Sequence, residues 1–141
     1  MNPFVNRIAY RSQYNYQLKA DHTYQLSFAP AQTINTEFIC FDIRGKITLW
    51  SGYAWDGPSG PVFHTASLMR ASLIHDALYQ LMREGHLDHK QYRKLADLEL
   101  RKIGVADGVF HFRAVYIYLA VRLFGAPFAD PAKAHPPLTA P

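Results

Sequence analysis

The spacing of apolar residues changes character near the middle of the chain. Before residue 60, short runs of β-branched and aromatic residues alternate with polar ones, which is typical of strands. After residue 65, apolar residues recur every three or four positions, which is typical of helices. The pattern predicts an α+β fold: an N-terminal antiparallel β-hairpin or small sheet packed on a C-terminal three-helix bundle. We expect a single domain over residues 1–125, β-rich over 1–60 and helical over 65–125, because 141 residues suffice for one core.

The clearest strand signal is a pair of β-rich runs on either side of Arg44-Gly45. Residues 38–43 (FICFDI) and 46–50 (KITLW) flank this short turn, and a glycine-containing turn between two such runs predicts a β-hairpin. The tyrosine-rich stretch 14–28 predicts further strand, and residues 29–36 (APAQTINT) predict a connecting loop.

The helical part divides at glycines into three predicted helices. They run over about 65–84, 88–104 and 107–124, and Gly85, Gly104 and Gly125 close them. Asp88 is a suitable N-cap for the second helix. The apolar residues of the three helices are, in turn, Ile74, Leu78 and Leu81; Tyr92, Leu95, Ala96, Leu100 and Ile103; and Phe112, Tyr116, Ala120, Leu123 and Phe124.

The last segment, residues 126–141, contains five of the nine prolines. Proline-rich chain without apolar periodicity predicts an extended or disordered tail. Such a tail is a candidate docking segment for other proteins.

Composition excludes several classes of function. The net charge is +4, but the basic residues are scattered, so we do not expect a nucleic-acid partner. Cys40 is the only cysteine, which excludes an intrachain disulfide and a cysteine-based zinc site. No apolar run reaches the roughly 18 residues that a transmembrane helix needs. The single cysteine favours a reducing compartment or a fold that is stable without disulfides. The N-terminal residues lack the apolar run of a signal peptide, so we expect any exit from the cell to occur by another route, such as lysis or inside a particle.

The most informative residues are His75-Asp76 in the first predicted helix and Asp97 in the second. A short connection at 85–89 makes these helices antiparallel neighbours. His75 lies about eleven residues before the centre of that connection, and Asp97 about ten after it. Because a helix rises about 1.5 Å per residue, the two side chains should lie at the same height and face each other.

This arrangement suits acid–base chemistry. A histidine can take a proton from water, and a carboxylate can hold its tautomer and stabilise the imidazolium. Tyr79 lies one turn after His75, where its hydroxyl can orient a carboxylate. Asp76 points about 100° away from His75 and is free to bind a hard cation such as calcium. The loop from Asp56 to Gly60 contains glycines that let backbone carbonyls turn toward such an ion.

A structural interpretation stays open beside the chemical one. Arg93 and Arg101 lie one turn before and after Asp97, and an arginine ladder on an exposed helix face needs no chemistry. Asp76 can pair with an arginine of the third helix, and His75 can be a core histidine with satisfied hydrogen bonds.

Several motifs follow one another in a fixed order along the chain: a strand pair, an Asp-Gly-x-Ser loop, His75-Asp76-x-Leu78-Tyr79, Ala96-Asp97, Arg113, Tyr116, Val121-Arg122 and Gly125. In this order the chain resembles a phage- and prophage-associated family of small single-domain proteins of unknown function, encoded among tail or lysis genes. The resemblance implies expression in the host cytoplasm and is compatible with a place in the virion, but it implies no established activity.

Residues 53–100 also resemble phospholipases of the A2 class, which combine a glycine-rich calcium loop, a His-Asp-x-x-Tyr helix and a distal Asp. The resemblance implies that His75 is the base that activates water and that Asp97 orients it. It further implies that Asp76 binds calcium. Carbonyls near Gly57 and Gly60, beside Asp56, would complete the calcium site. The cysteines that this class carries around the helix are absent.

The leading hypothesis is therefore a phage-encoded hydrolase with a calcium-assisted His-Asp site, acting on phospholipid or another envelope ester. An alternative is a non-enzymatic virion or tail-assembly protein, and a weaker one is a cell-wall hydrolase. An enzyme should place its site in a cleft beside the 56–60 loop. An assembly protein should bury or cap the polar residues with arginines and expose a large apolar surface.

Overall fold

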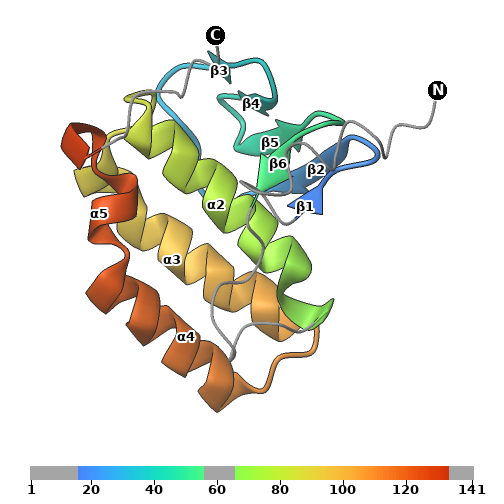
Figure 1. Ribbon diagram of the computed structural model, residues 1–141, viewed down its shortest axis with the longest axis vertical. Coiled ribbons are helices and arrows are strands. Elements are labelled where there is room, and N and C mark those ends of the chain that lie inside the picture. Colours follow the sequence, from blue (N-terminus) through green and yellow to red (C-terminus); the bar gives the residue numbers. More distant parts are fainter. Residues whose placement is uncertain (1–15, 56–65, 134–141) are drawn as a thin grey trace, which may run out of the picture.

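The computed structural model describes residues 16–55 and 66–133. An N-terminal antiparallel β part precedes three main helices, which confirms the α+β prediction. Helices α2, α3 and α4 lie side by side in that order, and the strands lie on the α2 side of the helical layer (Figure 1).

The strands form two small antiparallel sheets. The larger sheet has the order β2-β5-β4-β3, and β1 pairs with β6. The bounds are β1 Tyr16–Gln17, β2 His22–Gln25, β3 Ile34–Asn35, β4 Ile39–Phe41, β5 Lys46–Leu49 and β6 Ala54–Trp55. The predicted strand over 14–28 is thus divided within the described residues into β1 and β2, and the predicted loop over 29–36 contains β3.

The predicted hairpin is confirmed as β4 and β5, in which Phe41 pairs with Ile47. Its turn is longer than the predicted two residues, because the pairing stops at Phe41 and the Gly45 N–H donates to the Asp42 carbonyl at 3.0 Å. Gly45 has a φ of +87°, and a Cβ there would lie 2.7 Å from the Phe28 carbonyl oxygen. Glycine is therefore required at this position both for its conformation and for its close approach.

The helices follow the predicted order with shifted bounds. They are the short 3₁₀ turn η1 Ala66–Leu68, α2 Met69–Arg83, α3 His89–Ala106, α4 His111–Phe124, the short α5 Ala126–Ala129 and the 3₁₀ turn η2 Pro131–Lys133. The Asp88 side chain accepts a hydrogen bond from the Lys90 N–H at 3.1 Å, which confirms the predicted N-cap of α3. Gly85, after α2, has the left-handed φ of +82° that a helix C-terminus favours.

Two predicted helix ends were wrong. Helix α3 continues through Gly104 to Ala106, because Gly104 keeps helical geometry and packs against Leu68 and Val109. Asp107 does not begin the third helix. It caps the end of α3 and binds Arg70 at 2.7 Å, and Gly108 with a φ of +104° then turns the chain toward α4.

The segment predicted to be an extended tail from residue 126 begins instead with α5 and η2. Helix α5 packs on α2, Ala129 is buried, and an Arg83 N–H donates to the Phe128 carbonyl at 2.9 Å. Residues 134–141 lie outside the described part of the chain.

The core lies between the larger sheet and α2. The predicted stripe of Ile74, Leu78 and Leu81 is fully buried there, with Phe41 and Ile47 from the hairpin. Over the described residues, no helix is both long and apolar enough to cross a membrane.

Helix α4 lies with its predicted apolar residues turned outward. Phe112 is 77% exposed and Leu123 75%, whereas Ala114 and Ile117 are the residues buried against the other helices. Because both sides of α4 are apolar, periodicity alone does not indicate which side is buried.

Candidate functional site

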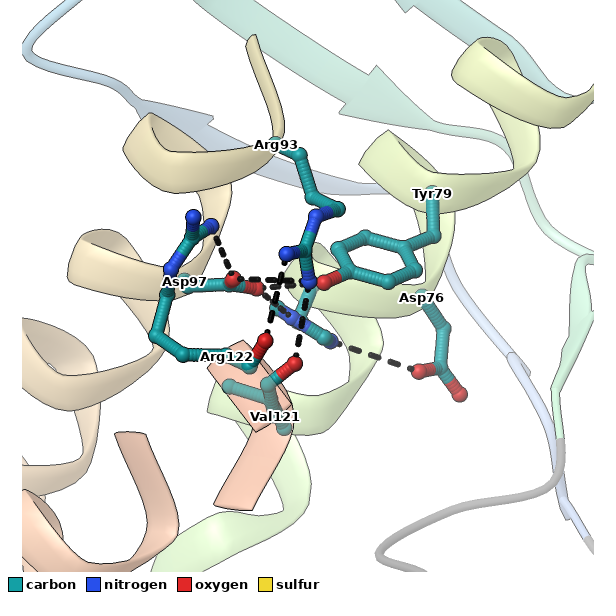
Figure 2. Close-up of polar contacts among 7 residues, drawn as sticks. Asp76, Tyr79, Arg93, Asp97, Val121 and Arg122 are labelled. Atoms are coloured by element: carbon teal, nitrogen blue, oxygen red, sulfur yellow. Dashed lines mark hydrogen bonds and ion pairs between the residues drawn. The ribbon is translucent and has the colours of Figure 1, made fainter. Parts of the chain in front are cut away.

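The central contact of the site joins α2 to α3. His75 Nε2 lies 2.8 Å from Asp97 Oδ1, so the two side chains face each other as their heights on the antiparallel helices predict (Figure 2). Asp97 is fully buried, and His75 is 8% exposed. A buried carboxylate next to an imidazole accepts a hydrogen bond, which places a proton on Nε2 and leaves Nδ1 of the neutral ring as an acceptor.

Tyr79 completes this contact from the same helix as His75. Its hydroxyl donates to Asp97 Oδ1 at 2.6 Å, and its ring lies 4.2 Å from the imidazole, centroid to centroid. The Tyr79 hydroxyl therefore lies where the sequence predicted it, as a hydrogen-bond donor to a carboxylate. Two donors on one oxygen fix the direction of Asp97 and, through it, of the imidazole.

Two arginines bind the other side of the Asp97 carboxylate. Arg122 of α4 donates to Oδ2 at 2.9 Å, and Arg93 of α3 lies 3.6 Å from the same oxygen. Arg93 also donates to the backbone carbonyls of Val121 and Arg122, at 3.0 and 3.2 Å (Figure 2). The Val121 carbonyl also accepts from the Gly125 N–H at 2.8 Å, so Arg93 adds a second donor to it and binds the Arg122 carbonyl in the last turn of α4.

The arginine ladder suggested by the sequence forms only in part. Arg93 does approach Asp97, but on a buried side of α3 and not on an exposed face. Arg101 instead stacks on the ring of Tyr118, 5.1 Å from its centroid. Arg122, an arginine of the third main helix, binds Asp97 and not Asp76.

Asp76 faces His75 Nδ1, whereas Asp97 binds the other ring nitrogen, Nε2. Its Oδ1 is 3.8 Å from His75 Nδ1, a distance for charge attraction but too long for a hydrogen bond, and its side chain is 37% exposed. The other predicted calcium ligands, Asp56, Gly57 and Gly60, lie outside the described residues. Within residues 16–55 and 66–133, no three His, Cys, Asp or Glu side chains group together as a metal site would require.

Burial and the mutual contacts of His75 and Asp97 shift their pKa values in opposite directions. Burial alone lowers the pKa of His75, but the negative charges of Asp76 and Asp97 and the hydrogen bond to Asp97 outweigh it and raise the pKa above its ordinary value. Burial likewise raises the pKa of Asp97, yet bonds from His75 and Tyr79 hold it below its ordinary value. Burial and the Asp97 carboxylate together raise the pKa of Tyr79. Tyr79 therefore acts as a hydrogen-bond donor and not as a proton source.

Gly125 belongs to the site, although the sequence indicated it as a helix end and as part of a family resemblance, and not as a neighbour of Tyr79. Its φ of −80° is open to any residue, so backbone conformation does not require glycine here. A Cβ at this position would lie 2.7 Å from the Tyr79 hydroxyl and 3.3 Å from Arg93 Nη1, and would also clash with the Val121 carbonyl. Glycine lets the C-terminus of α4 approach the two donors closely.

A second buried polar cluster was not predicted. Glu99 of α3 is almost fully buried and accepts hydrogen bonds from the Ser27 hydroxyl and N–H and from the Tyr24 hydroxyl. The guanidinium of Arg70 lies over the Tyr24 ring, 5.4 Å from its centroid. Nothing in the spacing of these residues along the chain indicates that they meet. The cluster ties the sheet to the helical layer.

The site thus contains an imidazole held by one carboxylate and flanked by a second, half-exposed one. Such a ring can take a proton at Nδ1 and can return it after the developing imidazolium has been stabilised by Asp97. A search of protein-family models, curated proteins and solved structures found no match to the chain.

Proposed function

We propose that the protein is a hydrolase in which His75 is the general base and Asp97 orients it. One observation supports this most directly: Asp97 Oδ1 accepts from both His75 and Tyr79, at 2.8 and 2.6 Å, which fixes the ring with Nδ1 on the side of Asp76. Satisfying a core histidine would not require the second, partly exposed carboxylate of Asp76 beyond Nδ1.

The proposed reaction is hydrolysis of an ester. His75 Nδ1 takes a proton from water as the water oxygen attacks the carbonyl carbon, and Asp97 stabilises the imidazolium. When the tetrahedral intermediate collapses, the ester C–O bond breaks and His75 returns the proton to the departing alkoxide. The products are a carboxylic acid and an alcohol, and the imidazole is neutral again.

Calcium is part of this proposal through Asp76. When bound, calcium would polarise the ester carbonyl and stabilise its negative charge. Calcium needs several oxygen ligands, and the described residues offer the Asp76 carboxylate, which is half-exposed and lies 3.8 Å from His75. The carboxylate of Asp56 and the carbonyls of Gly57 and Gly60 would supply the rest. His75 alone takes and returns the proton, and Asp97 stabilises the charged ring in between.

The proposed substrate class is a phospholipid or another ester of the cell envelope, and it rests on the resemblance to phospholipases A2. The test is fatty-acid release from mixed phosphatidylcholine and phosphatidylglycerol vesicles, with calcium and with a chelator. We expect His75→Gln to lower the rate by a factor of about 10² or more, which is the usual contribution of a general base. His86→Gln, which changes an exposed histidine in the α2–α3 loop, is the matched control and should keep the wild-type rate.

The rate should also increase with pH above 6.5, because the raised pKa of His75 keeps the base protonated to a higher pH than a free histidine. Folded protein that releases no fatty acid in either condition would contradict the phospholipid substrate. Loss of activity in both histidine variants would contradict the specific role of His75.

The calcium part has its own test. Calorimetric titration of the full chain should give saturable calcium binding that Asp76→Asn abolishes. Glu84→Gln removes an exposed carboxylate near the end of the same helix and should leave binding unchanged. Absence of calcium binding by folded wild type would remove the ion from the proposal and leave the His75–Asp97 pair to be tested alone.

A second candidate function is a non-enzymatic assembly protein of a phage particle. It is favoured by the full burial of Asp97 under Arg122 and Arg93, and by a broad apolar surface on α4. In that case His75→Gln should lower the free energy of unfolding, and the vesicle assay should detect no hydrolysis by any variant.

A further inference from the structure

The outer face of α4 carries an apolar stripe that no described element covers. It consists of Phe112, Tyr116, Leu119 and Leu123. Phe112 is 77% exposed, Tyr116 58% and Leu123 75%. Helix α4 lies at the edge of the helical layer with α3 on its inner side (Figure 1). We call these four residues the α4 stripe. Phe110, Phe124 and Phe128 extend it at both ends and are also exposed.

The spacing along the stripe is that of a helix–helix seam. Successive members are four, three and four residues apart, which is the repeat that keeps side chains in line along a contact between two helices. The charged residues between its members are Arg113 and Arg122, and the chain has no Asp or Glu between Asp107 and Asp130. No acidic side chain therefore interrupts the stripe.

The exposed area is that of an interface. Aromatic side chains present roughly 150–250 Å² each, so the seven exposed side chains amount to on the order of 800 Å². The largest apolar patch of a typical monomer is about 300–600 Å², and each partner of a stable complex buries about 800 Å². An area of this size, on α4 and the residues that adjoin its two ends, matches what each partner of a stable dimer buries.

We propose that the α4 stripe is the contact surface of a homodimer, in which α4 packs antiparallel against α4 of a second copy. A two-fold axis between Tyr116 and Leu119 brings Phe112 of each copy against Leu123 of the other, and Tyr116 against Leu119. The stripe is thus complementary to itself, which is the requirement for a two-fold contact. This proposal is independent of the proposed hydrolase activity.

The charges of α4 favour a second copy over an anionic lipid surface. Arg122 turns inward to Asp97, and Arg113 also has an interaction partner. The stripe is therefore apolar without a free cationic rim, and two copies can meet without bringing unpaired like charges together. Lipid surfaces are recognised by faces that combine apolar residues with available Lys or Arg.

The contact also bears on the candidate site. The side of α4 opposite the stripe supplies Arg122 to Asp97 and offers its last carbonyls to Arg93. Dimerisation therefore holds in place the helix that binds the buried carboxylate.

The test is sedimentation equilibrium of the full chain from micromolar to millimolar concentration. We expect twice the monomer mass for wild type. The double variant Leu119→Lys with Leu123→Lys should raise the dimer dissociation constant at least 100-fold, because both positions lie in the seam. Ile43→Lys changes a side chain that is 61% exposed in the β4–β5 turn, and this matched control should remain dimeric. Circular dichroism of each variant checks that the fold is kept.

Wild type that stays monomeric throughout this range overturns the proposal, as does a folded double variant that remains dimeric. A parallel arm measures sedimentation with phosphatidylglycerol vesicles. If wild type is monomeric and binds the vesicles while the folded double variant does not, the stripe belongs to lipid and not to a second copy.

Discussion

Asp97 is a buried charge with an unusually complete set of partners. One oxygen accepts from His75 and Tyr79, and the other faces Arg122 and Arg93. Burying a carboxylate is costly unless such partners replace its hydration, and removing a single partner leaves part of that cost uncompensated. Each donor around Asp97 should therefore contribute to stability, whether or not the site is catalytic.

Tyr79→Phe isolates the contribution of one donor. The change removes a hydroxyl that is 2.6 Å from Asp97 and keeps the buried ring. We expect the free energy of unfolding to decrease by about 1.5–3 kcal/mol, the range for hydrogen bonds to charged groups. Urea denaturation measures it. Tyr116→Phe, on the exposed side of α4, should change the value by less than about 0.5 kcal/mol. Equal effects of the two substitutions would contradict the role of the Tyr79 hydroxyl.

The raised pKa of His75 predicts a pH dependence of stability. The folded state binds this proton more tightly than the unfolded state, in which the pKa is near its ordinary value of 6.5. The stabilising contribution is complete below pH 6.5 and is lost as the pH rises through the folded-state pKa. We expect the free energy of unfolding, measured in urea between pH 6 and 9, to fall with pH more steeply in wild type than in His75→Gln. His86→Gln keeps His75 and should follow wild type. Parallel curves for all three proteins would rule out this contribution.

Helix α4 combines two unlike surfaces. Its inner side carries Arg122 and the terminal carbonyls that Arg93 binds, and its outer side carries the apolar stripe. Gly125 ends the helix where its backbone approaches the Tyr79 hydroxyl. The position of this helix end therefore determines how closely the arginines and Tyr79 surround Asp97.

Gly125→Ala should disturb the site through steric overlap. A Cβ would clash with the Val121 carbonyl and lie 2.7 Å from the Tyr79 hydroxyl, which forces a shift, and we expect a loss of about 1–3 kcal/mol in the free energy of unfolding. In the double variant with Tyr79→Phe, the loss of stability should be smaller than the sum of the two single losses, because the Tyr79 hydroxyl that overlaps the new Cβ is gone.

Gly85→Ala is the control for this cycle. That glycine has a φ of +82°, and no atom lies within 4 Å of the position that a Cβ would take. Alanine there therefore costs about 1–2 kcal/mol of backbone strain alone. Its effect should add to that of Tyr79→Phe. Additive effects for Gly125→Ala as well would contradict the close approach of Gly125 to Tyr79.

At the scale of the whole molecule, polar contacts join layers that are far apart in the sequence. Glu99 of α3 binds Tyr24 in β2 and Ser27 just after β2. Arg70 of α2 binds Asp107 at the end of α3. These contacts supplement the apolar core between the sheet and α2. They fix how the strands sit on the helices.

Glu99→Gln should report on this junction through Tyr24. Burial and the Glu99 carboxylate raise the pKa of Tyr24 to about 12. Without that charge the pKa should fall below about 12, but stay above the ordinary value of 10.0 because the burial remains. NMR titration of ¹³C-labelled tyrosine measures the pKa, and urea denaturation should show a loss of about 1–3 kcal/mol. An unchanged Tyr24 titration in folded Glu99→Gln would show that the two groups do not interact.

Local patterns along the chain were enough to predict most elements and the pairing of His75 with Asp97. Runs of β-branched residues, helical periodicity, Asp88 and Gly85 act over a few residues, so they predicted the hairpin and most of the helices. The short loop between α2 and α3 fixed the relative height of His75 and Asp97, because helical rise is constant. The same rule placed Tyr79 on the side of His75.

Packing between distant elements sets which side of α4 is buried, where α3 ends and which residues surround Asp97. Both sides of α4 are apolar, so the choice depends on the shape of the surface that α3 presents, to which Ala114 and Ile117 are fitted. The contacts of Asp97 with Arg122 and of Tyr79 with Gly125 join α2 and α3 to a helix whose orientation local periodicity does not fix. Such contacts depend on packing between distant elements, and local sequence patterns carry no information about that packing.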